Sequence, residues 1–398
     1  MFLDFTPAEV ARFFITYGIT GVVPLIAALY LLLRRGNAFA ADITSPIRLR
    51  RWAASFFAVS ALSHVWWYIY YVHSDGLVSL GWGYGSPHFV ADVMLDCLTL
   101  MTTIAGTLLA MLQDRRRSVW PVFVAMSPFV VLAVVIMFSP SLRLFHVAIA
   151  YVLLLYLLFS VYILFAVRQY GRWLRDNYAD LERKEVWGTH VVSLFFTLLF
   201  FLYTVVEDDI TLIYLLHLVE IVLFVLLLWR VETLPQLDEM AAEPAFPSAV
   251  HQVPDLQPDT PKSNQADVLG TDSRQPTSVP SNIDFAEIER LLEGRCVATR
   301  LYLQYDLSLQ QLAKALGTNR SYLSLYFSRL GINYNTYINN LRINHFISRY
   351  QEVADQQQPF TVQQLANDSG YRSYSTFSLA FKQRMGQSVT AWMREVGE

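Results

Sequence analysis

Apolar stretches fill the first 230 positions of this 398-residue chain and constrain its fold more than any other feature. A membrane-spanning helix needs about 20 mostly apolar residues. Seven stretches approach or exceed this length: Val10–Leu33, Trp52–Val72, Phe89–Leu112, Val119–Phe138, Phe145–Val167, Val186–Val206 and Ile210–Trp229. Charged residues make up only 16% of the chain, against about 25% in soluble globular proteins. Residues 1–234 are therefore predicted to form a bundle of seven transmembrane helices.

Arginine residues alternate between the predicted loops, and this alternation predicts the orientation of the bundle. The loops after the first, third and fifth stretches carry basic clusters at Arg34–Arg35, Arg115–Arg117 and Arg168–Arg175. The other three loops hold at most one basic residue, and the last of them is acidic at Glu207–Asp209. Because basic loops stay on the cytoplasmic side, the sequence predicts an outside N-terminus and a cytoplasmic C-terminus.

A proline-rich segment follows the last apolar stretch. Residues 235–283 hold eight of the sixteen prolines, interspersed with Ser, Gln, Asp and Thr, and they show no apolar periodicity. Such a segment cannot bury enough apolar surface to offset the conformational entropy of ordering it. We therefore predict a disordered tether with a root-mean-square span of roughly 35–42 Å.

Residues 284–398 have the composition of a soluble domain, with 12 Lys and Arg against 10 Asp and Glu. Ser308 is a typical helix N-cap, apolar residues at helical spacing follow it, and Gly317 can end the helix in the left-handed conformation. A second helix begins near Asn319. This order of cap, turn glycine and apolar residues predicts a helix-turn-helix motif at 309–330.

The same pattern occurs again 53 residues further along the chain. Thr361 corresponds to Ser308 as the predicted cap, and Gly370 corresponds to the first turn glycine. A second helix follows, so the sequence predicts another helix-turn-helix at 362–385. Residues 338–351 are predicted to form a helix that connects the two motifs.

The repeated motifs resemble the DNA-binding domain of the AraC/XylS transcription regulators over about 110 residues. The most diagnostic stretch lies in the second motif: Gly370-Tyr371, Ser373, Ser375, Phe377, Ala380-Phe381-Lys382 and Gly386. Val389 departs from the family, which usually has a helix-starting proline there. The resemblance implies an all-helical domain of seven helices, with two recognition helices in successive major grooves of DNA. It also implies that the apolar helices lie in a bacterial inner (cytoplasmic) membrane.

Helical periodicity separates the inward face of each predicted recognition helix from its open face. Leu323 and Phe327 point inward in the first, and Phe377 and Phe381 in the second. The residues left on the open side are predicted to bind double-stranded DNA: Asn319, Arg320, Ser321 and Ser324, then Arg372, Ser373, Ser375, Ser378 and Lys382. Arginine suits guanine and asparagine suits adenine, whereas serine and lysine more often contact phosphate.

Five ionisable residues lie inside the apolar stretches, where each charge costs roughly 2.5–3.5 kcal/mol. This predicted sensor cluster consists of His64, Asp92, Asp96, His217 and Glu220. Three interpretations stay open: a hydrogen-bonded network between helices, a pocket for a small molecule or ion, and a metal site. Because no tight ligand spacing such as H-x-x-x-H occurs, the metal site is the least favoured of the three, and the sequence assigns no metal ligands and no cofactor.

Together these patterns predict an all-helical, membrane-anchored DNA-binding regulator without catalytic residues, which couples a membrane or external signal to transcription. Its predicted partners are double-stranded DNA, the lipid bilayer, RNA polymerase, a second copy of the chain and an unidentified small-molecule or ion ligand. The alternative is a membrane enzyme or transporter with an accessory DNA-binding domain. Ser60, His64, Asp96 and His217 resemble zinc-dependent seven-span amide hydrolases, from which the single histidine of the seventh stretch departs.

Overall fold

The computed structural model describes residues 6–34, 37–39, 43–72, 87–139, 141–182, 184–186, 188, 191, 210–237 and 285–397. These residues are helical apart from turns and an isolated β-bridge, which confirms the all-helical class. The chain divides into two compact units. The N-terminal unit comprises Met1–Asp176 and Leu181–Ala242, and the C-terminal unit comprises Asn177–Asp180 and Glu243–Glu398.

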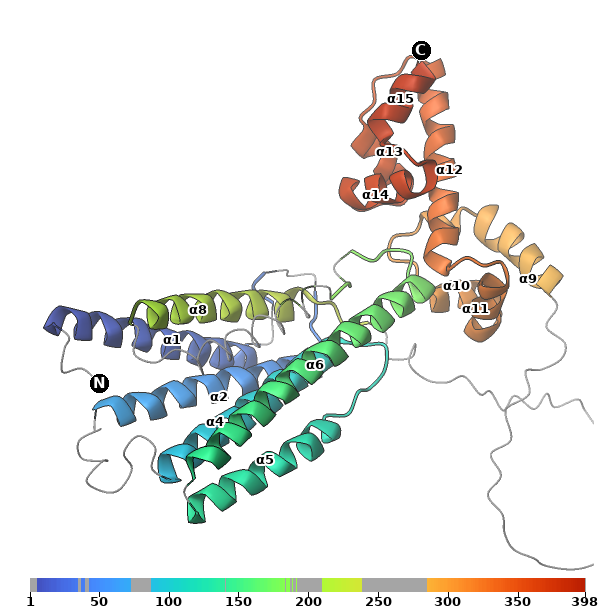
Figure 1. Cartoon of the computed structure of the whole chain (residues 1–398). Helices are drawn as coiled ribbons and strands as arrows, with labels where there is room; N and C mark the ends of the chain where they lie inside the picture. Colours follow the sequence, from blue (N-terminus) through green and yellow to red (C-terminus); the bar gives the residue numbers. More distant parts are fainter. Residues whose placement is uncertain are drawn as a thin grey trace, which may run out of the picture. The chain divides into compact units, whose positions relative to one another are not determined.

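Long helices make up the N-terminal unit (Figure 1). They are α1 (Pro7–Leu33), α2 (Ile47–Val72), α4 (Pro87–Met111), α5 (Trp120–Phe138), α6 (Leu142–Asn177) and α8 (Ile210–Thr233). Helix α1 packs against α2 and α8, and α4 packs between α2 and α5. Each helix covers one of the predicted apolar stretches. The remaining stretch, Val186–Val206, lies almost wholly outside the described residues, as do residues 238–284 of the predicted tether.

Among the residues that the structure describes, four segments are long and apolar enough to cross a membrane: Val10–Leu33, Val93–Met111, Arg143–Asn177 and Tyr214–Thr233. A fifth apolar helix, Trp120–Ile136, is shorter, and α2 is not among the candidate spans. Large apolar side chains cover the outer faces of these helices, and Ile15, Leu157 and Leu218 are each more than half exposed. An apolar surface of this extent needs a lipid or protein covering. The four long apolar helices are compatible with membrane spans and suggest a membrane-associated N-terminal region.

Seven α-helices build the described part of the C-terminal unit, the number that the family resemblance implies. They are α9 (Phe285–Leu292), α10 (Leu309–Leu316), α11 (Arg320–Arg329), α12 (Tyr334–Asp355), α13 (Val362–Asp368), α14 (Tyr374–Met385) and α15 (Val389–Gly397), with a π-helical turn, η2 (Glu293–Val297), and a 3₁₀ turn, η3 (Leu301–Leu303), after α9. Helix α12 is longer than the predicted 338–351. Helix α15 begins at the valine that stands where the family usually has proline, and that side chain is buried.

Local sequence signals explain where the paired helices begin and end. Ser308 accepts a hydrogen bond from the backbone N–H of Gln311, whose side chain bonds back to the backbone of Ser308, so the two form a capping box. Thr361 caps α13 in the same position. Gly317 ends α10 with φ 72°, the left-handed conformation that glycine adopts without strain. All three predictions are confirmed.

Two apolar cores lie along the length of α12. The first packs α10 and α11 around Leu312, Leu323 and Phe327. The second packs α13, α14 and α15 around Phe346 and Phe377, with the aromatic ring centroids of these two only 4.5 Å apart. Because each helix pair has its own core, the open face of each second helix is held in a fixed orientation on its half of the unit.

Candidate DNA-binding surface and membrane cluster

Helices α11 and α14 are the candidate recognition helices, and a side-chain cap defines the start of each. Asn319 accepts a 2.8 Å hydrogen bond from the backbone N–H of Ser321, and Ser373 accepts one of 3.3 Å from Thr376. The predicted inward residues are fully buried or nearly so, as Leu323 and Phe381 illustrate. The helical register predicted from the sequence is therefore confirmed for both helices.

The predicted DNA-contacting residues fall into two groups in the structure. Those with exposed side chains are Ser321, Ser324, Arg372, Ser375 and Lys382, and those that are partly buried are Asn319, Arg320, Ser373 and Ser378. Asn319 and Ser373 use their side-chain oxygens as helix caps. A DNA contact from either residue must therefore coexist with its capping bond or replace it.

Two tyrosines on the same helices were not predicted from the sequence. Tyr322 and Tyr374 lie in the first turn of α11 and α14, and each side chain is more than one third exposed. An aromatic residue on an amphipathic helix is usually interpreted as a packing residue, which is why periodicity overlooked both. Their position beside the helix caps was the signal that could have found them.

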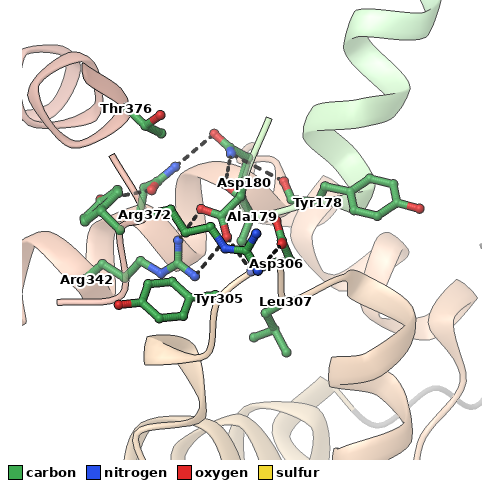
Figure 2. A network of polar contacts seen from close by, with 12 residues as sticks. Tyr178, Ala179, Asp180, Tyr305, Asp306, Leu307, Arg342, Arg372 and Thr376 are labelled. Carbon is green, nitrogen blue, oxygen red and sulfur yellow. Dashed lines mark hydrogen bonds and ion pairs between the residues drawn. The ribbon is translucent and has the colours of Figure 1, made fainter. Parts of the chain in front are cut away.

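The Asn177–Asp180 segment, which begins at the last residue of α6, belongs to the C-terminal unit. Figure 2 shows its residues Tyr178, Ala179 and Asp180. The Ala179 N–H donates a 3.1 Å hydrogen bond to the Leu307 carbonyl, and Tyr178 forms an antiparallel bridge with Ser308. Asn335 of α12 donates to the Ala179 carbonyl. The segment thus pairs with the residues before α10 through an isolated β-bridge and backbone hydrogen bonds.

A buried ion pair holds the same segment in place. The Arg342 side chain is 0% exposed, and its Nη1 donates a 2.7 Å hydrogen bond to Asp180 Oδ1. Its other donors bond to the carbonyls of Tyr302 and Gln304, both at 2.8 Å. Asp180 also accepts a 2.7 Å bond from the Asp306 N–H. Full pairing of this kind is what a buried arginine requires, since an uncompensated buried charge is strongly destabilising.

Both arginines predicted to recognise guanine are engaged within the C-terminal unit. Arg320 donates from Nε and Nη2 to Asn177 Oδ1, at 2.9 and 2.6 Å. Burial lowers the pKa of Arg320 from its ordinary value. Arg372 pairs with Asp306 at 2.8 Å and lies over the Tyr305 ring (Figure 2). Asn177 therefore occupies one hydrogen-bonding edge of a candidate base-reading side chain, a contact that the sequence did not indicate.

Within the N-terminal unit, three members of the predicted sensor cluster come together. His64 Nε2 lies 3.5 Å from Glu220 Oε2, and His217 Nδ1 lies 3.6 Å from the same oxygen. Asp96, another member of the predicted cluster, accepts hydrogen bonds from Ser63 at 2.8 Å and Trp67 at 3.3 Å. The cluster that the structure describes is therefore centred on Glu220. The side chain of Asp92 lies outside the described residues.

A comparison with protein families adds direct support for the C-terminal unit. A family model described as a helix-turn-helix domain matches residues 312–395, from within α10 to α15. No curated protein and no solved structure matches the chain. The C-terminal region is thus a helix-turn-helix domain of the AraC type, and this supports a DNA-binding transcription regulator.

Proposed function

We propose that this protein is a membrane-anchored, sequence-specific DNA-binding transcription regulator. The observation that carries the proposal is the helix-turn-helix match over residues 312–395, which covers both capped helices α11 and α14. In this proposal the two helices are tandem recognition helices that enter successive major grooves, with half-sites about 10–10.5 base pairs apart. Arg320 and Arg372 read guanine, while Ser321, Ser375 and Lys382 contact the phosphate backbone.

The first test measures sequence-specific DNA binding by the full chain in detergent. Arg372→Ala is expected to weaken binding to the selected operator by roughly 5- to 150-fold, because one bidentate base contact contributes about 1–3 kcal/mol of discrimination. The base preference at one operator position should relax as well. Footprinting against competitor DNA measures both effects. Arg394→Ala, which removes an exposed arginine of α15, is the matched control and should bind normally.

Equal footprints for Arg372→Ala, Arg394→Ala and the unmodified chain would contradict the assignment of α14 as a recognition helix. A loss in both variants that is uniform over all DNA sequences would instead indicate general electrostatic binding, because phosphate contacts carry no sequence information. Only a loss confined to Arg372→Ala, with relaxed base preference, supports the proposal.

Regulation of this kind requires the DNA-binding domain and the chromosome to share a compartment. The alternating arginines predict a cytoplasmic C-terminus. A reporter enzyme that is active only in the cytoplasm is therefore expected to be active when fused after Pro235, and a periplasmic phosphatase is expected to be inactive at the same position. A fusion after Leu33, which precedes the first basic loop, should behave in the same way. An active phosphatase after Pro235 would exclude the proposed function.

The Asn177–Asp180 segment suggests how DNA binding by this regulator is inhibited. Asn177 Oδ1 and a guanine compete for the Nε and Nη2 donors of Arg320. We infer that the docked segment favours the form that does not bind DNA, and that a signal transmitted along α6, which ends at Asn177, releases it.

Removing the Asn177 amide should therefore increase DNA affinity. Asn177→Ala is expected to raise operator affinity by roughly 10- to 150-fold, because hydrogen bonds to a charged group contribute about 1.5–3 kcal/mol. Asp176→Ala, which alters the preceding exposed residue, is the control and should leave affinity unchanged. Titration of labelled operator with both variants measures the effect. Unchanged or weaker binding by Asn177→Ala would show that the contact does not restrain the domain.

A further inference from the structure

Two imidazoles and one carboxylate converge inside the N-terminal unit. His64 comes from α2, and His217 and Glu220 come from α8. Each residue offers one ligand atom, and the three atoms lie within 4.8 Å of one another. Both histidines are buried, and the Glu220 side chain is only 20% exposed. The spacing of three residues between His217 and Glu220 places both on one face of α8.

The separations fit ligands that share an ion better than they fit direct hydrogen bonds. A charge-assisted N–H···O bond is about 2.7–2.9 Å long. The two imidazole nitrogens lie 3.5 and 3.6 Å from Glu220 Oε2. Tetrahedral zinc has bonds of about 2.0–2.1 Å to nitrogen and oxygen, so its ligand atoms are separated from one another by roughly 3.3 Å. Small side-chain rotations would therefore place the three atoms around one ion.

Neighbouring groups hold His64 in the orientation that this requires. Its Nδ1 lies 2.8 Å from the Ser60 carbonyl, so Nδ1 carries a proton and donates it. In the neutral imidazole, the Nε2 lone pair then faces Glu220, 3.5 Å from Oε2. This is the usual support for a metal-binding histidine. The Tyr17 ring packs against both imidazoles, with centroids 5.1 and 5.3 Å away. At Gly21, an added Cβ would lie only 3.1 Å from the Cβ of His64, so the backbone of α1 packs closely against α2 at this histidine.

We propose that His64, His217 and Glu220 bind one divalent transition-metal cation of the zinc class, and that this cation is the signal received by the regulator. Imidazole ligands favour zinc and its neighbours over Ca²⁺ and Mg²⁺, which prefer all-oxygen sites. Two neutral imidazoles and a carboxylate leave a bound divalent ion with a net charge of +1 and an open fourth position. A water molecule or an anionic group completes the coordination. The role in transcription rests on the proposed function, whereas metal binding does not.

The test measures metal binding by the full chain, purified in detergent without a histidine tag. After chelator treatment and dialysis, the protein is titrated with Co²⁺ and then with Zn²⁺. One Co²⁺ per chain should bind and produce the visible absorption of a tetrahedral site, and one Zn²⁺ should displace it. His217→Ala and Glu220→Gln should each weaken Co²⁺ binding by more than about 100-fold, since loss of a supporting group alone costs 10–100-fold. His146→Ala, an exposed histidine of α6, is the control and should bind normally.

The outcomes of this test distinguish a failure of the metal-site inference from a failure of the proposed function. Absence of stoichiometric Co²⁺ or Zn²⁺ binding overturns the proposal, as does equal affinity in His217→Ala and His146→Ala. Operator binding by the same preparations is measured in parallel with and without Zn²⁺. Specific operator binding without a metal site overturns only this inference, while metal binding without any specific operator binding overturns the proposed function. Metal binding together with a change in operator affinity that Glu220→Gln abolishes supports both.

Discussion

Replacement of Arg342 by methionine is expected to destabilise the C-terminal unit by about 3–5 kcal/mol, because it leaves a buried carboxylate without its charge partner. Asp180 loses its ion pair, and the carbonyls of Tyr302 and Gln304 lose their donors. The methionine keeps much of the side-chain volume, so the cost is mainly electrostatic. Loss of this much stability removes a large part of the 5–15 kcal/mol that a typical domain possesses, and DNA binding should fail with it.

Arg349 on the same helix provides the matched control. It pairs with Glu352 at 2.6 Å on an exposed surface, and exposed pairs contribute at most about 1 kcal/mol. The rate of Cys296 alkylation reports urea unfolding of the full chain, because this thiol is fully buried in the folded unit. Burial also raises the pKa of the Cys296 thiol to about 11. Alkylation should begin at a much lower urea concentration in Arg342→Met than in Arg349→Met. Identical midpoints would mean that the buried pair contributes nothing.

Replacement of Gly370 by alanine should destabilise the same unit by about 2–5 kcal/mol. The backbone there has φ +89°, a conformation that costs an L-residue roughly 1–2 kcal/mol. An added Cβ would also lie 2.9 Å from the Leu303 carbonyl oxygen and 3.0 Å from Arg342 Nε. Overpacking of this kind adds about 1–3 kcal/mol. Because the carbonyl belongs to the backbone, the clash cannot be relieved by rotating a side chain.

Gly331→Ala separates the two contributions. Its φ is +68°, and no heavy atom lies within 4 Å of an added Cβ, so it carries the conformational strain without the clash. The same alkylation assay should report a loss of about 1–2 kcal/mol for Gly331→Ala and a clearly larger loss for Gly370→Ala. Equal losses would show that strain at positive φ accounts for the whole effect. The sequence indicated a turn glycine at 370, whereas the close approach of Leu303 is visible only in the structure.

Local chemistry explains why much of the C-terminal unit could be predicted from the sequence. A serine or threonine cap, apolar residues at helical spacing and a turn glycine act within a few residues, so Ser308, Thr361 and Gly317 each mark a helix boundary directly. The inward positions of Leu323 and Phe377 follow from the same spacing. Apolar length likewise indicated the membrane-associated character of the first 230 residues.

For the candidate site residues, the sequence predicted which face of its own helix each residue occupies, but not which residues of other elements it contacts. Periodicity placed Arg320 and Arg372 on the open side, but it could not show that Asn177 and Asp306 engage them. The sequence also placed Asp96 and His64 in one cluster of ionisable residues, and the structure shows that Asp96 accepts hydrogen bonds from Ser63 and Trp67. Depth along a helix can be counted from the sequence, whereas rotation about its axis depends on packing against neighbouring helices.

The sequence by itself determined the helical segments, the caps and the identity of the ionisable residues, because these depend on short-range propensity and on apolar length. Only the tertiary structure decided which distant residues meet. The Asn177–Asp180 segment lies more than 120 positions before its partners Arg320 and Arg342. Its four residues are too few to show a periodicity from which these contacts could be predicted. Glu220 was likewise one of five ionisable residues in the apolar stretches, and only the packing of α2 against α8 shows that it meets His64. Long-range pairing of this kind is set by the geometry of the packed helices, and no local pattern encodes it.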